Sequence, residues 1–183
     1  GTVTVTNAVA ITGSASELTA ALVTAGSLVE VSDATATVND ADGTAITAAA
    51  LSAIGAKTTG TVTVTNAVAI TGSPSEVTAA LVTAGSLVEV TDAAVTITGN
   101  PTITELNNIA AKTTGVVTAT LAADSLSNLG ALTTAGTDAI TITVNDAGGT
   151  PVTAANLSTL GGKTAGTVTV SNACLLYTSD AAD

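Results

Sequence analysis

GTVTVTNAVAITGSASELTAALVTAG, at residues 1–26, returns at residues 60–85 with two substitutions, Pro74 for Ala15 and Val77 for Leu18. A more diverged copy follows, and a further copy opens with GTVTVSNA. A repeat of 59 residues is typical of solenoids, propellers and domain arrays, in which neighbouring copies bury their apolar side chains against each other. We therefore expect one repeat region, residues 1–173, made of units 1–59, 60–114 and 115–165 and a partial unit 166–173.

Each unit contains two similar halves. In the first half, TVTVT at residues 2–6 alternates polar and apolar side chains, which predicts a strand. After Asn7 the segment ITGSASELTAALVTAG changes to helical spacing, with Leu18, Ala21 and Leu22 on one face. LVEV, at residues 28–31 and 87–90, predicts a short additional strand.

The second half repeats this order. ATATV at residues 34–38 predicts a strand, and Leu51 and Ile54 form the apolar stripe of the helix that follows. A cation beside the carbonyl end of a helix stabilises it by about 0.3–1 kcal/mol. We interpret all the lysines as such structural caps, because each follows a second-half helix: Lys57, Lys112 and Lys163.

Capping residues support the helix boundaries. Ser14 with Glu17, and Ser73 with Glu76, fit the S-x-x-E capping box. Pro74 falls at the first helical position, where proline is best tolerated. In the third unit the sequence predicts Asp124 as the N-cap. Three glycines at the ends of TAG triplets are predicted to be left-handed residues after a helix: Gly26, Gly85 and Gly136.

Strands that alternate with helices favour the α/β class with a parallel sheet and right-handed crossovers. We expect a right-handed solenoid of stacked strand-helix repeats, with TVTVT-type strands side by side. The alternative is an all-β solenoid without helices, because short Thr/Val-rich strands fit that fold too.

Composition excludes several functions. Three lysines against fourteen acids give a net charge of −11, which repels nucleic acid. Polar residues interrupt every apolar run well short of the ~20 residues of a membrane span. Without histidine the chain has no Ser-His-Asp, Cys-His or His-metal chemistry, and it has no phosphate-binding glycine motif. We expect no catalytic residues, no cofactor and no enzyme activity.

The most metal-like segment is Asp40-Ala41-Asp42-Gly43, whose acids and glycine turn resemble part of a calcium loop. The aligned loops keep only Asp146 in one copy and Asn100 in another, so an Asx-type turn is the favoured interpretation and bound calcium the alternative.

Two other polar sets recur with the period. Asparagines at strand ends are expected to bond turn backbone, with a ligand role as the alternative: Asn7, Asn39, Asn66, Asn145 and Asn172. Paired carboxylates resemble those of glycosidases, but their recurrence favours a solvated acidic edge: Glu30, Asp33, Glu89 and Asp92.

The last ten residues break the repeat. After Ala173 the chain reads CLLYTSDAAD in place of VAITGS. This segment, 174–183, resembles the translation of a transposase adapter used in sequencing libraries, so we interpret it as an artefactual tail on a fragment open at both ends. Cys174 is then neither a nucleophile nor a metal ligand.

Residues 1–173 resemble repeat tracts of very long bacterial cell-surface or secreted proteins, including those of marine cyanobacteria, on phrases such as GTVTVTNAVAITGSASELTAALVTAG and VNDAGGTPVTAANLSTLGGKTAGTVTVSNA. The resemblance implies an extracellular or cell-surface structural spacer or adhesive stalk. Partners are then an unknown surface ligand, or other copies through the open solenoid ends.

The alternative function is a binding face built by the repeats themselves, for carbohydrate, protein, ice or mineral. The near identity of the first two units, including Thr19 and Thr78, favours a spacer. An ice- or mineral-binding face needs Thr2, Thr4 and Thr6 to point outward, and we expect helices packed over that side to bury them.

Overall fold

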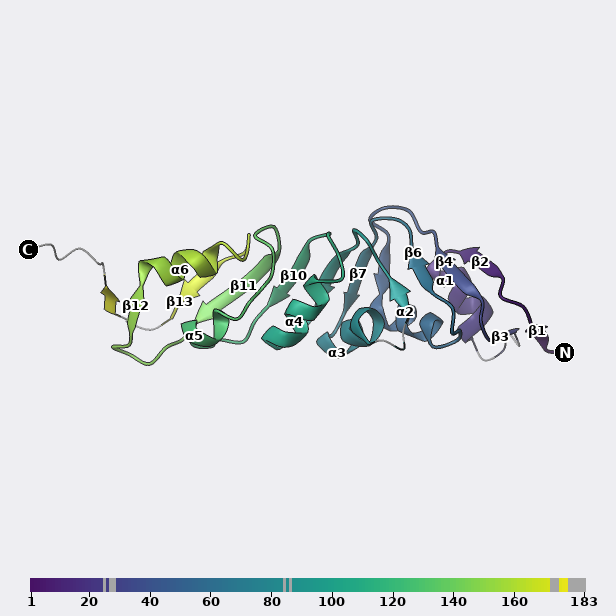
Figure 1. The fold of residues 1–183 in the computed structure, drawn as a ribbon, viewed down its shortest axis with the longest axis horizontal. Helices are drawn as coiled ribbons and strands as arrows, with labels where there is room; N and C mark the ends of the chain where they lie inside the picture. The colour runs from purple at the N-terminus through teal and green to yellow at the C-terminus, as the bar shows by residue number, and fades with distance from the viewer. Residues whose placement is uncertain (25, 27–28, 84, 86, 172–174, 178–183) are drawn as a thin grey trace, which may run out of the picture.

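The computed structural model describes residues 1–24, 26, 29–83, 85, 87–171 and 175–177, the last three without their side chains. The molecule is elongated, with β1 (Val3–Val5) at one end and β12 (Pro151–Thr153) at the other, and its strands succeed one another along the long axis (Figure 1). It is a mixed α/β structure in which every strand pairing is parallel. The α/β prediction is confirmed, and the all-β alternative is wrong because helices are present.

The largest sheet has six strands in the order β13-β11-β10-β9-β7-β5. They are β5 (Ala45–Thr47), β7 (Ala69–Gly72), β9 (Ala94–Ile97), β10 (Val117–Thr120), β11 (Ala139–Val144) and β13 (Val168–Val170).

A second sheet has four strands in the order β2-β4-β6-β8, and two strand pairs complete the set. The four strands are β2 (Ala10–Gly13), β4 (Thr35–Val38), β6 (Val62–Val64) and β8 (Val88–Glu89). The pairs are β1 (Val3–Val5) with β3 (Val29–Val31), and β12 (Pro151–Thr153) with β14 (Leu175–Tyr177) in the tail.

The helices are short, and each lies within a single half-repeat. First-half helices have four residues, and two of them continue into π-helical turns: α1 (Ala15–Leu18) with η1 (Thr19–Val23), α3 (Pro74–Val77) with η2 (Thr78–Val82), and α5 (Leu126–Leu129). Second-half helices have eight residues: α2 (Ala48–Gly55), α4 (Ile103–Ala110) and α6 (Ala154–Gly161).

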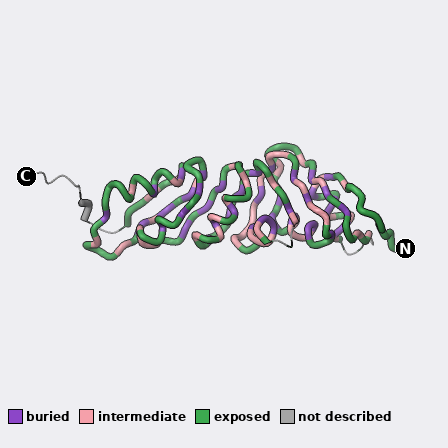
Figure 2. Tube along the Cα trace, viewed as in Figure 1, coloured by how far each residue is buried: buried purple, intermediate pink, exposed green. Residues whose placement is uncertain are grey.

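The core follows from strand alternation. In β9, Val95 and Ile97 are buried while Ala94 and Thr96 are exposed, and α4 buries its apolar Leu106 and Ile109. Burial of each such side chain contributes about 1.5–3 kcal/mol. Figure 2 shows buried residues along the whole length of the molecule, so the core is a continuous layer and not a single centre.

The register departs in part from expectation. LVEV forms the predicted extra strands β3 and β8. β6, a TVTVT-type strand, pairs on one side with β4 of the preceding half-repeat, as expected. On its other side it pairs with β8, the LVEV strand of its own half-repeat, and not with the main strand of the next. The helices start after Ser14 and Ser73, as the capping boxes predicted, but the residues just before these serines, for which no strand was predicted, form β2 and β7.

Two cap predictions are wrong in the third unit. Ser125, not Asp124, is the N-cap of α5, because the Asp124 carboxylate instead accepts bonds from the Ser125 N–H and the Asn128 side chain. Gly136 has no left-handed conformation, and a Cβ there would lie 2.9 Å from the carbonyl oxygen of Gly162. The same prediction at Gly26 and Gly85 depends on adjoining residues outside the described ones.

Candidate functional site

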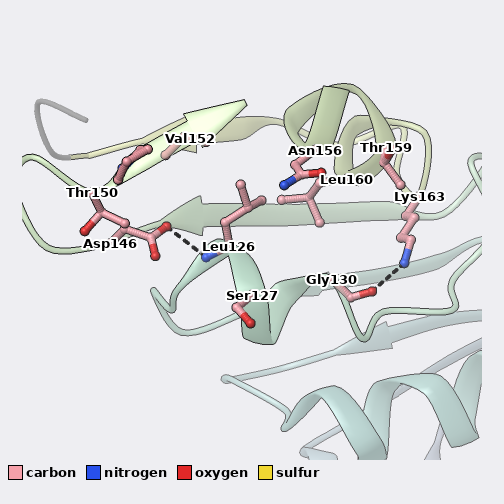
Figure 3. Close-up of a pocket in the computed structure, with 11 residues that line it drawn as sticks. Leu126, Ser127, Gly130, Asp146, Thr150, Val152, Asn156, Thr159, Leu160 and Lys163 are labelled. Atoms are coloured by element: carbon pink, nitrogen blue, oxygen red, sulfur yellow. Dashed lines mark hydrogen bonds between the residues drawn. The ribbon is translucent and has the colours of Figure 1, made fainter. Parts of the chain in front are cut away.

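A groove of about 420 Å³ lies between α5 and α6 and reaches β12 (Figure 3). Hydroxyl and apolar side chains line it, with Asp146 near one end and Lys163 near the other. In Figure 3, Asn156 and Leu160 point from α6 toward α5. A groove of about 580 Å³ lies between α1 and α2 and includes Asp40, which aligns with Asp146.

The acids of these grooves bond to backbone. Asp146 Oδ2 accepts from the Leu126 N–H at 2.9 Å, and Asp40 Oδ2 accepts from the Ala15 N–H at 2.7 Å. Leu126 and Ala15 are the first residues of α5 and α1, so each carboxylate satisfies an amide that a helix leaves without a partner and faces the positive end of its dipole.

Lys163 bonds to the opposite end of α5. Its Nζ donates to the carbonyl oxygens of Gly130, at 2.7 Å, and Leu132, at 2.5 Å. The sequence predicted that Lys163 caps α6, the helix that it follows; its side chain instead bonds carbonyl groups at the end of α5, a helix of the preceding half-repeat.

The candidate calcium acids are also held by the protein. Asp42 Oδ1 accepts from the Ala67 N–H at 3.1 Å, and the Asp40 carbonyl accepts from the Asn66 side chain at 2.6 Å. No group of three or more potential metal ligands occurs among the residues the structure describes. These hydrogen bonds show that the loop at residues 40–43 connects one half-repeat to the next.

The other recurrent polar residues lie at strand ends and edges. Asn66 bonds a turn carbonyl, as predicted for strand-end asparagines, and Asn145 accepts from the Ser171 hydroxyl at 3.1 Å. Asn7 and Asn39 are exposed, and Asn172 lies outside the described residues. Glu30, Asp33, Glu89 and Asp92 are all exposed.

Each helix predicted to carry a capping box has one. The Glu17 carboxylate accepts from the backbone N–H and the hydroxyl of Ser14, at 2.8 and 2.9 Å. These bonds favour the ionised carboxylate and so hold the pKa of Glu17 below its usual value. The bond from the Ser14 backbone N–H has the larger effect and the bond from the Ser14 hydroxyl the smaller one. The pKa values of Glu76 and Glu105 are lowered for the same reason, through Ser73 and Thr102.

A recurrent joint made of a threonine and a glycine was not singled out in the sequence. Thr164 Oγ1 donates toward the carbonyl oxygens of Ile140, at 2.7 Å, and Asp138, at 3.0 Å, and accepts from the Gly166 N–H at 2.8 Å. Thr58 and Gly60 make the same arrangement with Ala34, and Thr113 and Gly115 make it with Ala93. The signal was the triplet Thr-x-Gly after every lysine.

The glycine of this joint is required by close approach. A Cβ at Gly60 would lie 2.3 Å from the Ala34 carbonyl oxygen, and one at Gly166 would lie 2.3 Å from that of Ile140. At the joint, the backbone at the start of one half-repeat therefore packs directly against the backbone of the strand region in the half-repeat before it.

No family model, no curated protein and no solved structure matches this chain. No helix in the described part of the chain is long and apolar enough to cross a membrane.

Proposed function

We propose that this chain is a segment of a right-handed parallel solenoid that acts as a non-catalytic spacer or adhesive stalk in an extracellular or cell-surface repeat protein. The observation that carries the proposal is the use of the recurrent polar side chains. Asp40, Asp146 and Lys163, with the threonines of the Thr-x-Gly joints, bond one half-repeat to the next.

The reach of these bonds supports a solenoid. The hydrogen bonds between half-repeats described above join residues 20 to 33 positions apart. Strands pair at similar separations, as Val3 with Val29 and Ala69 with Ala94. When each unit contacts only its neighbours, stability is a sum of local interfaces, and length can increase without a new core.

The shape is tested by small-angle X-ray scattering of this chain and of a variant carrying three additional copies of residues 1–59. Each added unit contributes two strand layers of about 4.8 Å, so the longer protein should be extended by roughly 30 Å at an unchanged cross-section radius. A growth of the cross-section in proportion to mass would contradict the solenoid.

The stalk role is tested by pulling the longer protein between two handles in single-molecule force spectroscopy. Bonded half-repeats in series predict a sawtooth of unfolding steps at comparable forces. A single cooperative collapse at low force would count against a mechanical spacer.

Sequencing of the full open reading frame tests the cell-surface location, which predicts an export signal or a surface anchor.

A further inference from the structure

Threonines form straight rows across the six-stranded sheet. Thr47 of β5 pairs with Thr71 of β7, Thr71 with Thr96 of β9, and Thr96 with Thr118 of β10. One step further along the strands, Thr120 pairs with Thr141, and beyond that Thr143 pairs with Thr169. The first row spans four strands and ends where Thr118 pairs with Ala139, and the other two pairings span two strands each, so that together these threonines reach all six strands.

These side chains point away from the core. Their strand neighbours Ile70, Val95 and Val117 are buried, whereas Thr96 and Thr118 are exposed, as are Thr120 and Thr141. The helices therefore cover the Val/Ile side of the sheet and leave the threonine side open. The expectation that helices would bury the threonine side of such strands is wrong, and Thr2, Thr4 and Thr6 are exposed as well.

The hydroxyls of this face are free to bond outside the protein. Thr96, Thr118, Thr120 and Thr141 make no side-chain hydrogen bond within the described part of the chain, in contrast to Thr58 or Thr164 in the joints. Each hydroxyl can donate one hydrogen bond and accept others.

The face carries no charge, although the chain has a net charge of −11. None of the six strands contains Asp, Glu or Lys. By contrast Glu17, Glu76 and Glu105 lie on the helices, and Glu30 and Glu89 lie on β3 and β8. A partner that is recognised through charge, such as a calcium mineral, a nucleic acid or an anionic membrane, therefore has no complement on this face.

The geometry specifies a regular partner. Strands are spaced by about 4.8 Å and same-face residues by about 6.7 Å, so the face is a two-dimensional lattice of hydroxyls and methyls. A neutral polysaccharide crystal is also regular, but sugar platforms rely on flat aromatic side chains, and Tyr177 in the tail is the only aromatic residue of the chain. The face that remains is a regular array of threonine hydroxyls, with the methyl groups of threonines and of alanines such as Ala45 and Ala94 between them.

We propose that the threonine face of the six-stranded sheet, centred on Thr96, Thr118, Thr120 and Thr141, binds the surface of ice. The hydroxyls take up positions in the hydrogen-bonded water lattice, and the methyls between them exclude mobile water. The proposal adds a ligand to the stalk and requires only the parallel stacking of strands, so its failure would leave the spacer role and its scattering test untouched.

The test is partition of the whole chain into a slowly growing ice front, together with microscopy of single ice crystals. The unsubstituted protein should be enriched in the ice and should shape the crystals. Thr118→Lys, at the centre of the face, should reduce the enrichment at least tenfold. Thr104→Lys adds the same side chain at an exposed site on α4 and should leave the enrichment unchanged.

Circular dichroism and melting curves show whether both variants fold. If Thr118→Lys fails to fold, Thr141→Lys replaces it, on the next row of the same face. Three results would overturn the proposal: exclusion of the unsubstituted protein from ice, equal enrichment of the two folded variants, or Thr118-dependent binding to crystalline cellulose or chitin without binding to ice.

Discussion

The Asp40 carboxylate accepts a hydrogen bond from the Ala15 N–H at 2.7 Å, across 25 residues of sequence. The second unit has neither partner. Pro74 replaces Ala15 and has no N–H, and Gly99 replaces Asp40. A Cβ at Gly99 would lie 3.9 Å from the Pro74 ring. The second unit has thus lost both the N–H donor and the carboxylate acceptor, and a proline ring packs beside a glycine in their place.

This exchange predicts a coupling that a double-mutant cycle can measure. Asp40→Ala should lower the free energy of unfolding by about 1–2 kcal/mol, because it leaves the Ala15 N–H without its acceptor. In an Ala15→Pro background, which has no such donor, the same substitution should cost less than about 0.5 kcal/mol. Urea denaturation gives both values, and equal costs in the two backgrounds would refute the pairing.

The Thr-x-Gly joint predicts a sharp difference between two substitutions of Thr164. Thr164→Val keeps the shape but removes a buried hydroxyl that serves several backbone groups, so it should destabilise the chain by about 2–3 kcal/mol. Thr164→Ser keeps the hydroxyl and should cost less than about 1.5 kcal/mol. Thermal and urea unfolding followed by circular dichroism report the difference, and similar losses for both variants would argue against the hydroxyl.

Gly60 tests the close approach at the same joint. Gly60→Ala places a methyl 2.3 Å from a backbone oxygen and should destabilise the protein by more than about 3 kcal/mol or prevent folding of the neighbouring half-repeats. Gly161→Ala is the matched control, because a Cβ there meets nothing within 4 Å and the residue is helical. The control should be neutral or stabilising by up to about 1 kcal/mol. Equal soluble yield and melting temperature of the two variants would contradict the model of the joint.

The capping boxes predict a loss of stability in acid. Folding lowers the pKa of Glu17, Glu76 and Glu105, so the folded state favours their ionised form. Their contribution is therefore present above the unfolded-state pKa, near 4.5, and is lost as the pH falls through the lowered folded-state values. Melting temperatures between pH 7 and pH 3 should fall at the acidic end.

Glutamine is the control for this acid sensitivity. It keeps the capping-box geometry but does not titrate, so a triple Glu→Gln variant should show a shallower fall in melting temperature below about pH 4.5. An identical pH profile for the variant and the original chain would show that other carboxylates dominate the response.

Local patterns were sufficient for much of the fold. Alternation in TVTVT and ATATV located β1, β4 and β6, and the serine–glutamate spacing located the starts of α1 and α3. β2 was missed because AITG is only four residues long and runs directly into a helix. Asp124 was mistaken for a cap because it adjoins Ser125, and both are good capping residues.

The partners of the candidate site residues were not predictable, because register is set by the packing of whole half-repeats. Nothing near Asp40 in the sequence indicates Ala15 as its donor, and nothing near Lys163 indicates Gly130. The outward direction of the threonines was also missed. It depends on which side the helices cover, and alternation alone leaves the two sides of a strand equivalent.

The Thr-x-Gly joint has an evolutionary consequence. The same Thr-x-Gly triplet ends each of the three second halves. Unequal recombination between gene copies that stays in phase with the repeat therefore keeps every joint intact. Descendants can therefore vary in copy number, and so in length, without passing through a misfolded intermediate. Exchange out of phase changes the number of residues between the Thr-x-Gly triplet and the carbonyl group that it contacts in the preceding half-repeat, and selection should remove it.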